Sequence, residues 1–223
     1  MFTRIAITAL FAGFITGIIA AILQFWQVQP MLLHSELYEG GDLIHFGANP
    51  NSTHQDLPGF DAVRDGLSIL FTTLIYTGYA LILTAVVALF ADRGHSFTLG
   101  QGVLFGLAGF TAIQLAPAMG LPPEVPGAGA AALEARQFWW VITAIATAIG
   151  LGLIGFSKNI VYLIAGVVLV SLPHIIGAPE PDVFAGPTPP ELAAHFASRA
   201  LGVGMAAWAI MGALTVFFWN REG

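Results

Sequence analysis

Long runs of apolar residues, separated by shorter polar segments, dominate this sequence. Each of six runs is 19 to 24 residues long and contains no Asp, Glu, Lys or Arg. About 20 residues of α-helix cross the hydrocarbon core of a bilayer, so each run is long enough to span a membrane. The pattern predicts an all-α integral membrane protein, a single domain with a bundle of about six transmembrane helices. The predicted spans are 5–28, 67–90, 99–118, 138–156, 160–178 and 200–219.

The first run has the position of a signal peptide, at the start of the chain. The apolar region of a signal peptide is usually about 7–15 residues long, whereas residues 5–28 form a longer run. We therefore expect the first run to be retained as a spanning helix.

Prolines interrupt two of the six runs. Pro117 lies near the end of the third run, and Pro173 lies in the fifth. Proline lacks a backbone N–H and its ring collides with the preceding helical turn, so we predict that the third and fifth helices are broken. Broken helices that line a substrate path recur in transporters. A kinked helix followed by a stiff loop is the alternative.

Acidic residues are concentrated in every second loop. Six spans place both termini on one side of the membrane, and the loops of the other side are 29–66, 119–137 and 179–199. These three acidic loops hold eleven of the thirteen acidic residues. Short loops on the termini side carry basic residues beside their helices, and such loops remain in the cytoplasm. We therefore expect cytoplasmic termini and acidic loops that face outward.

An arginine precedes each helix that returns from an acidic loop. Arg64, Arg136 and Arg199 stand just before the second, fourth and sixth runs, each near an acidic residue, which for Arg136 is Glu134. The repeated order of an outgoing helix, an acidic loop and an arginine suggests three helical hairpins in series.

Composition excludes several classes of protein. Charged residues make up 9% of the 223 residues, far below the roughly 25% of soluble domains. The absence of cysteine excludes disulfides, thiolate metal sites and thiol nucleophiles. A net charge of −6 argues against binding to nucleic acid. The phosphate-binding motif GxxxxGK followed by Ser or Thr does not occur, so any use of ATP would depend on a partner.

The first acidic loop contains residue types that bind divalent metals. Imidazole and carboxylate groups are ligands of cobalt, nickel, zinc and iron. The functional interpretation is a site that collects cations at the entrance to a pathway, and the alternative is an acidic loop that is only solvated. The candidate ligands are His34, Glu36 and Glu39, followed by Asp42, His45 and His54.

Further candidates lie beside the interrupted helices. Gln114 precedes Pro117, and Glu124 stands between prolines just beyond the third span. His174 is the only histidine, acid or base inside any predicted span, and Glu180 follows it. Ionisable groups within the membrane are unfavourable to bury and are usually functional. We expect His174, Gln114 and Glu124 to meet where the two helices break; a neutral histidine bonded to a neighbouring helix is the alternative.

The order of these motifs resembles the CbtA family of probable cobalt transporter subunits, through essentially the whole chain. The family's first acidic loop is often strongly His-rich, whereas this one has only three histidines. The matching stretches are a YEGG-like segment with Glu36, Tyr38 and Glu39, then GFTAIQLAPAMGLPPEVPG (109–127), ARQFWW (135–140), LPHIIGAPEP (172–181) and PELAAHF (190–196).

The resemblance implies a bacterial inner-membrane protein, not an enzyme, that takes part in cobalt uptake tied to cobalamin synthesis. A small single-span partner, CbtB-like and histidine-bearing, is implied as well. The implied ligand is a transported Co²⁺ or a similar divalent cation, with no permanently bound cofactor. Membrane lipid and a homo- or hetero-oligomeric assembly complete the expected partners.

Two classes of function other than transport remain open. A non-transporting scaffold or assembly subunit of a larger complex would also have uncharged helices with small-residue surfaces. An intramembrane enzyme or haem carrier ranks last, because bis-histidine haem ligation needs two facing histidines at depth and the spans hold only His174. The preferred interpretation is a subunit of a divalent-metal permease, in which the acidic loops attract the cation.

Overall fold

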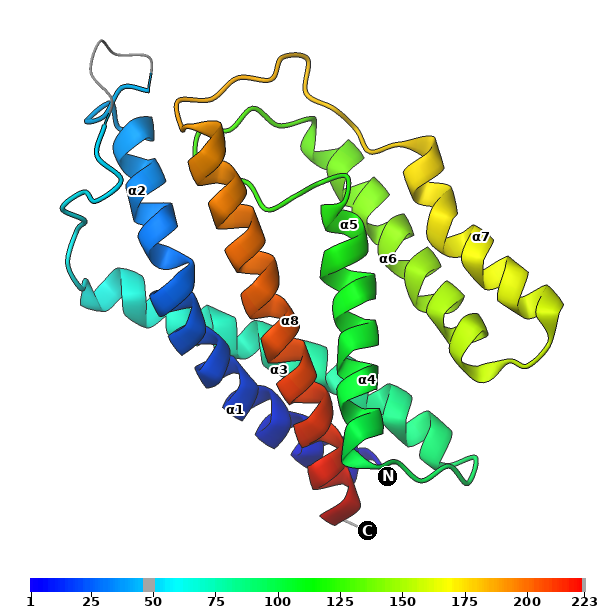
Figure 1. The fold of residues 1–223 in the computed structure, drawn as a ribbon. Coiled ribbons are helices and arrows are strands. Elements are labelled where there is room, and N and C mark those ends of the chain that lie inside the picture. The colour runs from blue at the N-terminus through cyan, green and yellow to red at the C-terminus, as the bar shows by residue number, and fades with distance from the viewer. Residues whose placement is uncertain (46–50, 222–223) are drawn as a thin grey trace. The chain divides into compact units, whose positions relative to one another are not determined.

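The computed structural model describes residues 1–45 and 51–221, and the regular structure within these ranges is entirely helical. Five helices are long and apolar enough to cross a membrane, and α7 is an apolar helix of 17 residues. The predicted all-α membrane fold is therefore confirmed. In chain order the elements are α1 (Phe2–Gln27), α2 (Gln29–Glu39), α3 (Ala62–Ala91), α4 (Leu99–Phe110), the π-helical turn η1 (Thr111–Leu115), α5 (Ala116–Ala118), α6 (Leu133–Phe156), α7 (Ile160–Ile176) and α8 (Pro190–Arg221), as Figure 1 shows.

Several helices extend beyond the apolar runs that predicted them. α3 begins where Asp61 Oδ1 accepts hydrogen bonds from the backbone N–H groups of Val63 (3.0 Å) and Arg64 (2.7 Å), so a capping residue sets its start. The acidic loop 29–66 was predicted as a loop throughout, but its first part forms α2. Pro30 lies in the first turn of α2, where a missing N–H costs no hydrogen bond.

The two intramembrane prolines behave differently from one another. The third span changes from α-helix to the π-helical turn η1 just before Pro117, and it ends at Ala118 as predicted. Pro173 lies inside α7, which continues to Ile176, so the predicted break at this proline is wrong. A proline in the last turn removes a single ladder bond, and the helix ends instead at Gly177, whose φ is 91° and whose N–H donates to the Pro173 carbonyl at 3.0 Å.

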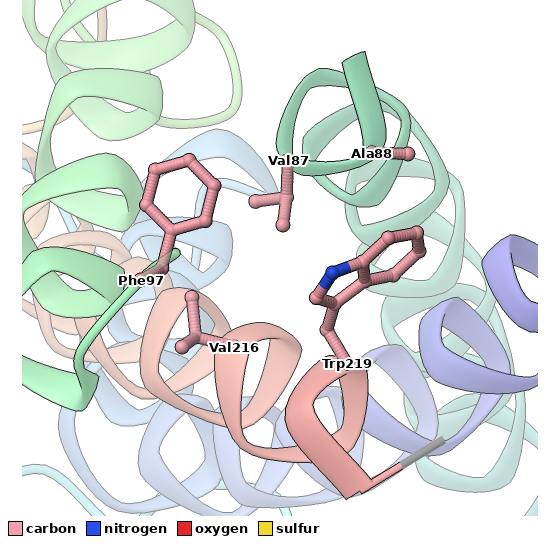
Figure 2. Close-up of a cluster of buried hydrophobic side chains, with 5 residues drawn as sticks. All are labelled: Val87, Ala88, Phe97, Val216 and Trp219. Carbon is pink, nitrogen blue, oxygen red and sulfur yellow. The ribbon is translucent and has the colours of Figure 1, made fainter. Parts of the chain in front are cut away.

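The chain forms two compact units, which we describe separately. Unit 1 consists of residues 1–27, 58–110 and 202–223. Its helices α1 and α3 pack at close range, because a Cβ on Gly13 would collide with the Thr77 backbone. One cluster of its core, shown in Figure 2, joins α3, the segment before α4 and the end of α8. The buried members of this cluster are Val87, Ala88, Phe97, Val216 and Trp219.

The two ends of the chain lie together within unit 1. Arg4 donates a hydrogen bond to the Trp219 carbonyl, and its guanidinium carbon lies 3.9 Å from the centroid of the Trp219 indole. Asn220 Nδ2 donates to the Phe97 carbonyl at 3.0 Å. The first helix therefore starts at the same end of the unit at which the last helix finishes (Figure 1).

Unit 2 consists of residues 28–57 and 111–201. Its centre is α6, against which α7, η1 and α5 all pack. α6 and α7 form a hairpin in which Gly150 faces Gly166, since a Cβ on either glycine would lie 2.7 Å from the carbonyl oxygen of the other. The small residues thus bring the two helix backbones together, as they do in membrane proteins generally.

Candidate functional site

Parts of all three acidic loops contact one another in unit 2. A Cβ on Gly127, whose φ is 75°, would lie 3.1 Å from the Pro187 ring and 3.4 Å from the Glu39 side chain. The Gly129 N–H donates to the Ala185 carbonyl at 2.8 Å. Segments far apart in the sequence therefore form one acidic layer, which we define as the described residues of 28–57, 119–132 and 177–189.

The carboxylates of this acidic layer do not form a ready-made metal site. Glu36, Glu39 and Glu180 are all exposed. Within residues 1–45 and 51–221, no three histidine or acidic side chains come close enough together to hold a metal ion. These side chains can therefore raise the local concentration of cations through their charge, but they do not surround an ion in this conformation.

Glu124 is engaged in an ion pair. Its Oε2 accepts a hydrogen bond from Arg136 Nη2 at 2.6 Å, and both side chains are partly exposed. The sequence placed Glu134 near Arg136, but the structure pairs this arginine with Glu124, twelve positions away, because the loop 119–132 folds back on the first turn of α6. A cation that binds Glu124 must compete with a guanidinium.

His34 is buried, in contrast to the exposed carboxylates. Its side chain is 8% exposed, and its ring stacks on Tyr38 with centroids 5.6 Å apart. Its buried Nε2 has no hydrogen-bond partner in the part of the chain that the structure describes. Burial lowers the pKa of His34 below its ordinary value of 6.5, so the imidazole is neutral at pH 7. A neutral imidazole with a free nitrogen is the form that binds metals.

Trp139 connects the ends of the third span and of α7. The His174 ring lies edge-on to the Trp139 indole, with centroids 6.1 Å apart and an interplanar angle of 72°. Gly120 lies so close to Ala178 and Trp139 that a Cβ on it would lie 2.6 Å from Ala178 Cβ and 2.7 Å from the indole. The two helix ends predicted to meet are therefore in contact through a tryptophan.

The predicted ligands of this region are all positioned around α6. Gln114 lies in η1, which packs against α6, and His174 lies on α7 against Trp139. Glu124 reaches the same helix through its ion pair with Arg136. Two of these side chains contact α6 directly, and the third belongs to a turn that packs against it.

Sequence reasoning missed the polar face of α6. Trp139 entered the sequence analysis only as part of the ARQFWW motif, and Thr143 and Thr147 were not considered. The three residues are four positions apart and all are buried. That spacing places them on one side of a helix, and it is the signal that could have identified them in an otherwise apolar run.

Comparison with known proteins supplies one match. The family model described as "Probable cobalt transporter subunit (CbtA)" matches residues 2–220 of the chain. No curated protein and no solved structure matches it.

Proposed function

We propose, from the premise that this chain belongs to the CbtA family of probable cobalt transporter subunits, that it is the membrane subunit through which a divalent cation, Co²⁺, enters the cell. Family membership and five spanning helices make it a multi-pass transport protein. The observation that carries the finer proposal is the contact of both predicted helix ends with Trp139, beside the acidic layer of unit 2.

Capture begins with the acidic loops. The exposed carboxylates of Glu36, Glu39 and Glu180 attract a dication, and a single-signed surface raises association rates by roughly 10- to 1000-fold at low ionic strength. In this proposal His34 then offers the free nitrogen of a neutral imidazole. Imidazole and carboxylate ligands together suit Co²⁺. The loops act as a collector and hold no ion tightly.

Binding then occurs around the outer end of α6. His174 supplies an imidazole nitrogen, Gln114 an amide oxygen and Glu124 a carboxylate. Glu124 exchanges its Arg136 partner for the cation, so that binding of the ion is coupled to release of the arginine. A partly exposed ion pair contributes only about 0–1 kcal/mol, and a dication can therefore displace the guanidinium.

The direction of movement follows from the membrane potential. We place the acidic loops outside the inner membrane and both termini in the cytoplasm. A negative interior then favours entry of a dication by about 4.6 kcal/mol per 100 mV, twice the value for a single charge. As a subunit the chain works with partners, and a small single-span CbtB-like protein is the one we propose.

Cobalt accumulation in cells that contain the complete uptake system tests this function. We expect His174→Ala and Glu124→Gln to lower accumulation by about tenfold or more, equivalent to ~1.4 kcal/mol or more of lost binding, at unchanged membrane abundance. Glu134→Gln, an exposed acid of the same region, is the matched control and should accumulate normally. Normal uptake by the first two variants would reject the site. A wild-type chain that supports no uptake would reject transport and favour the scaffold.

A further inference from the structure

The chain passes between unit 1 and unit 2 at four places, which we call junctions. They follow Gln27, Leu57, Phe110 and Leu201. The second junction lies in a loop, whereas the other three lie within a helix or between two elements that follow one another almost directly. A helical segment shared by two units either joins them rigidly or bends at the junction. The local backbone at each junction distinguishes these two cases, because helix bends have identifiable causes.

The first junction interrupts a helix at a proline. Val28 alone joins α1 to α2. Pro30 has no N–H to donate to the carbonyl of Trp26, four positions back, so the hydrogen-bond ladder of α1 does not run on regularly into α2. A new ladder starts at the Val28 carbonyl, which accepts from the N–H groups of Met31 at 3.0 Å and Leu32 at 3.1 Å. The backbone at this junction is therefore held by fewer regular bonds than a continuous helix would have.

The third junction coincides with the π-helical turn η1. Unit 1 ends at Phe110, the last residue of α4, and η1 begins at the next residue, Thr111. A π-helical turn pairs each carbonyl with the N–H five positions ahead, not four, and Pro117 just beyond it has no N–H to offer. Turns of this kind are a usual cause of bends in helices. The third span therefore changes its hydrogen-bond pattern at the residue where it changes unit.

The fourth junction lies at a glycine. α8 is helical throughout, and the boundary between the units falls between Leu201 and Gly202. Gly202 is exposed, and a Cβ on it would meet nothing within 4 Å, so close packing does not explain the glycine. Glycine is less favourable than alanine in the interior of a helix because its backbone is freer. α8 is therefore weakened at the position where it passes from one unit to the other.

Helices that belong to one unit are regular by comparison. α3 lies in unit 1 and α6 in unit 2 apart from their ends, and they are α-helical through all 30 and 24 residues. Both contain a glycine with equally open surroundings, Gly78 in α3 and Gly152 in α6, so an open glycine alone does not mark a junction. The distinguishing observation is that a restarted ladder, a π-helical turn and an unpacked glycine all fall on the boundaries between the units.

We propose that Val28, η1 and Gly202 together form a hinge, about which unit 1 and unit 2 move as two bodies. Hinges consist of a few residues at loops or helix ends that absorb a change in backbone angles. Bending is easiest at these positions because the regular ladder is already interrupted at Val28 and η1, and no side chain restricts the backbone at Gly202. The use of this movement in the passage of a cation rests on the function proposed above, whereas the movement itself does not.

Distances between two spin labels test the movement without any transport. The chain has no cysteine of its own, so labels can be attached to introduced cysteines at exposed positions. Arg93→Cys in unit 1 and Lys158→Cys in unit 2 report on the two units together. Phe60→Cys and Arg93→Cys, at opposite ends of α3 within unit 1, are the matched control pair. The distances are measured by double electron–electron resonance on the purified full chain in lipid.

We expect a broad or two-peaked distance distribution for the pair that joins the two units and a single narrow distribution for the pair within unit 1. The double substitution of Pro30→Ala, which restores an N–H donor, and Gly202→Ala should narrow the first distribution and leave the second unchanged. Equally narrow distributions for both pairs before these substitutions would overturn the hinge. A broad distribution that the double substitution does not narrow would overturn the assignment of the hinge to these residues.

Cobalt uptake by the complete system tests whether the hinge serves transport. Gly202→Ala is compared with Gly152→Ala, since both add a methyl group in open space to a helix and neither should lower Tm. We expect Gly202→Ala to lower uptake at least threefold at unchanged membrane abundance and Gly152→Ala to leave it unchanged. Equal uptake by the two variants would overturn the role of the hinge in transport. A wild-type chain without uptake would reject the proposed function, whereas the spin-label distances would still decide whether the hinge exists.

Discussion

The contact between α6 and α7 allows a matched test of packing within a single helix. Gly150 and Gly152 both lie inside α6, two positions apart. A Cβ on Gly150 would lie 2.7 Å from both the Gly166 carbonyl oxygen and a Val170 methyl group, whereas a Cβ on Gly152 would have nothing within 4 Å. Alanine at either position gains the same helix propensity, up to about 1 kcal/mol, so the difference between the two variants isolates the packing.

The magnitude follows from the distances. Contacts of 2.7 Å are several tenths of an ångström too short, so the hairpin must open when Gly150 becomes alanine. Overpacking of this kind costs about 1–3 kcal/mol. We therefore expect Gly150→Ala to be about 1–3 kcal/mol less stable than Gly152→Ala. For a chain of this size, 1 kcal/mol shifts Tm by about 2–4 °C.

Thermal unfolding of the two purified variants in the same detergent is the assay. Gly152→Ala should melt at or above the temperature of the wild-type chain, and Gly150→Ala should melt clearly below Gly152→Ala. Equal melting temperatures for the two variants would refute the reasoning, because they would mean that α7 does not contact α6 at Gly150.

Three further predictions concern the acidic layer and the start of α3. Arg136→Gln should tighten Co²⁺ binding, measured by titration of the purified protein, and a second substitution, Glu124→Gln, should abolish that gain if the carboxylate is the ligand. Burial lowers the pKa of His34 below 6.5, whereas the unfolded chain takes up a proton near pH 6.5, so the stability of the folded protein should fall as the pH drops below about 6.5. His34→Phe keeps the stacking on Tyr38 and should make thermal stability less dependent on pH in melts between pH 7 and 5. An unchanged pH dependence in this variant would contradict the role of His34. Asp61→Ala removes a capping carboxylate that accepts two backbone N–H groups and should cost about 0.5–2 kcal/mol in thermal unfolding, whereas Asp61→Asn should cost less.

The fold could be predicted from the sequence where hydrophobicity alone determines the structure. The third span was predicted to end at residue 118, and it does, because the apolar run ends there. α2 was missed because its 11 residues mix polar and apolar side chains, so no long apolar run marks it. The helix through Pro173 was missed because the sequence does not show that only the last turn follows this proline.

The candidate residues of the site could be predicted from the sequence, but the side chains that they contact could not. His174, Gln114 and Glu124 were identified from residue type and position near the ends of spans. The pairing of Glu124 with Arg136 depends on how the loop 119–132 folds back, and the contact of His174 with Trp139 depends on the packing of two helices. Both are tertiary contacts between residues 12 and 35 positions apart, which no local pattern encodes.

Unit 1 is made of segments that are far apart in the sequence, and this has a consequence for its folding during synthesis. This unit combines residues 1–27 and 58–110 with residues 202–223, and its core cluster includes Val216 and Trp219. A nascent chain that has been made as far as residue 201 has all the residues of unit 2 but lacks the part of α8 that belongs to unit 1. Until then Gly102 and Gly106 of α4 lack the α8 backbone, at Trp208 and Gly212, against which they pack in the finished unit. Unit 1 is therefore completed only when α8 has been made.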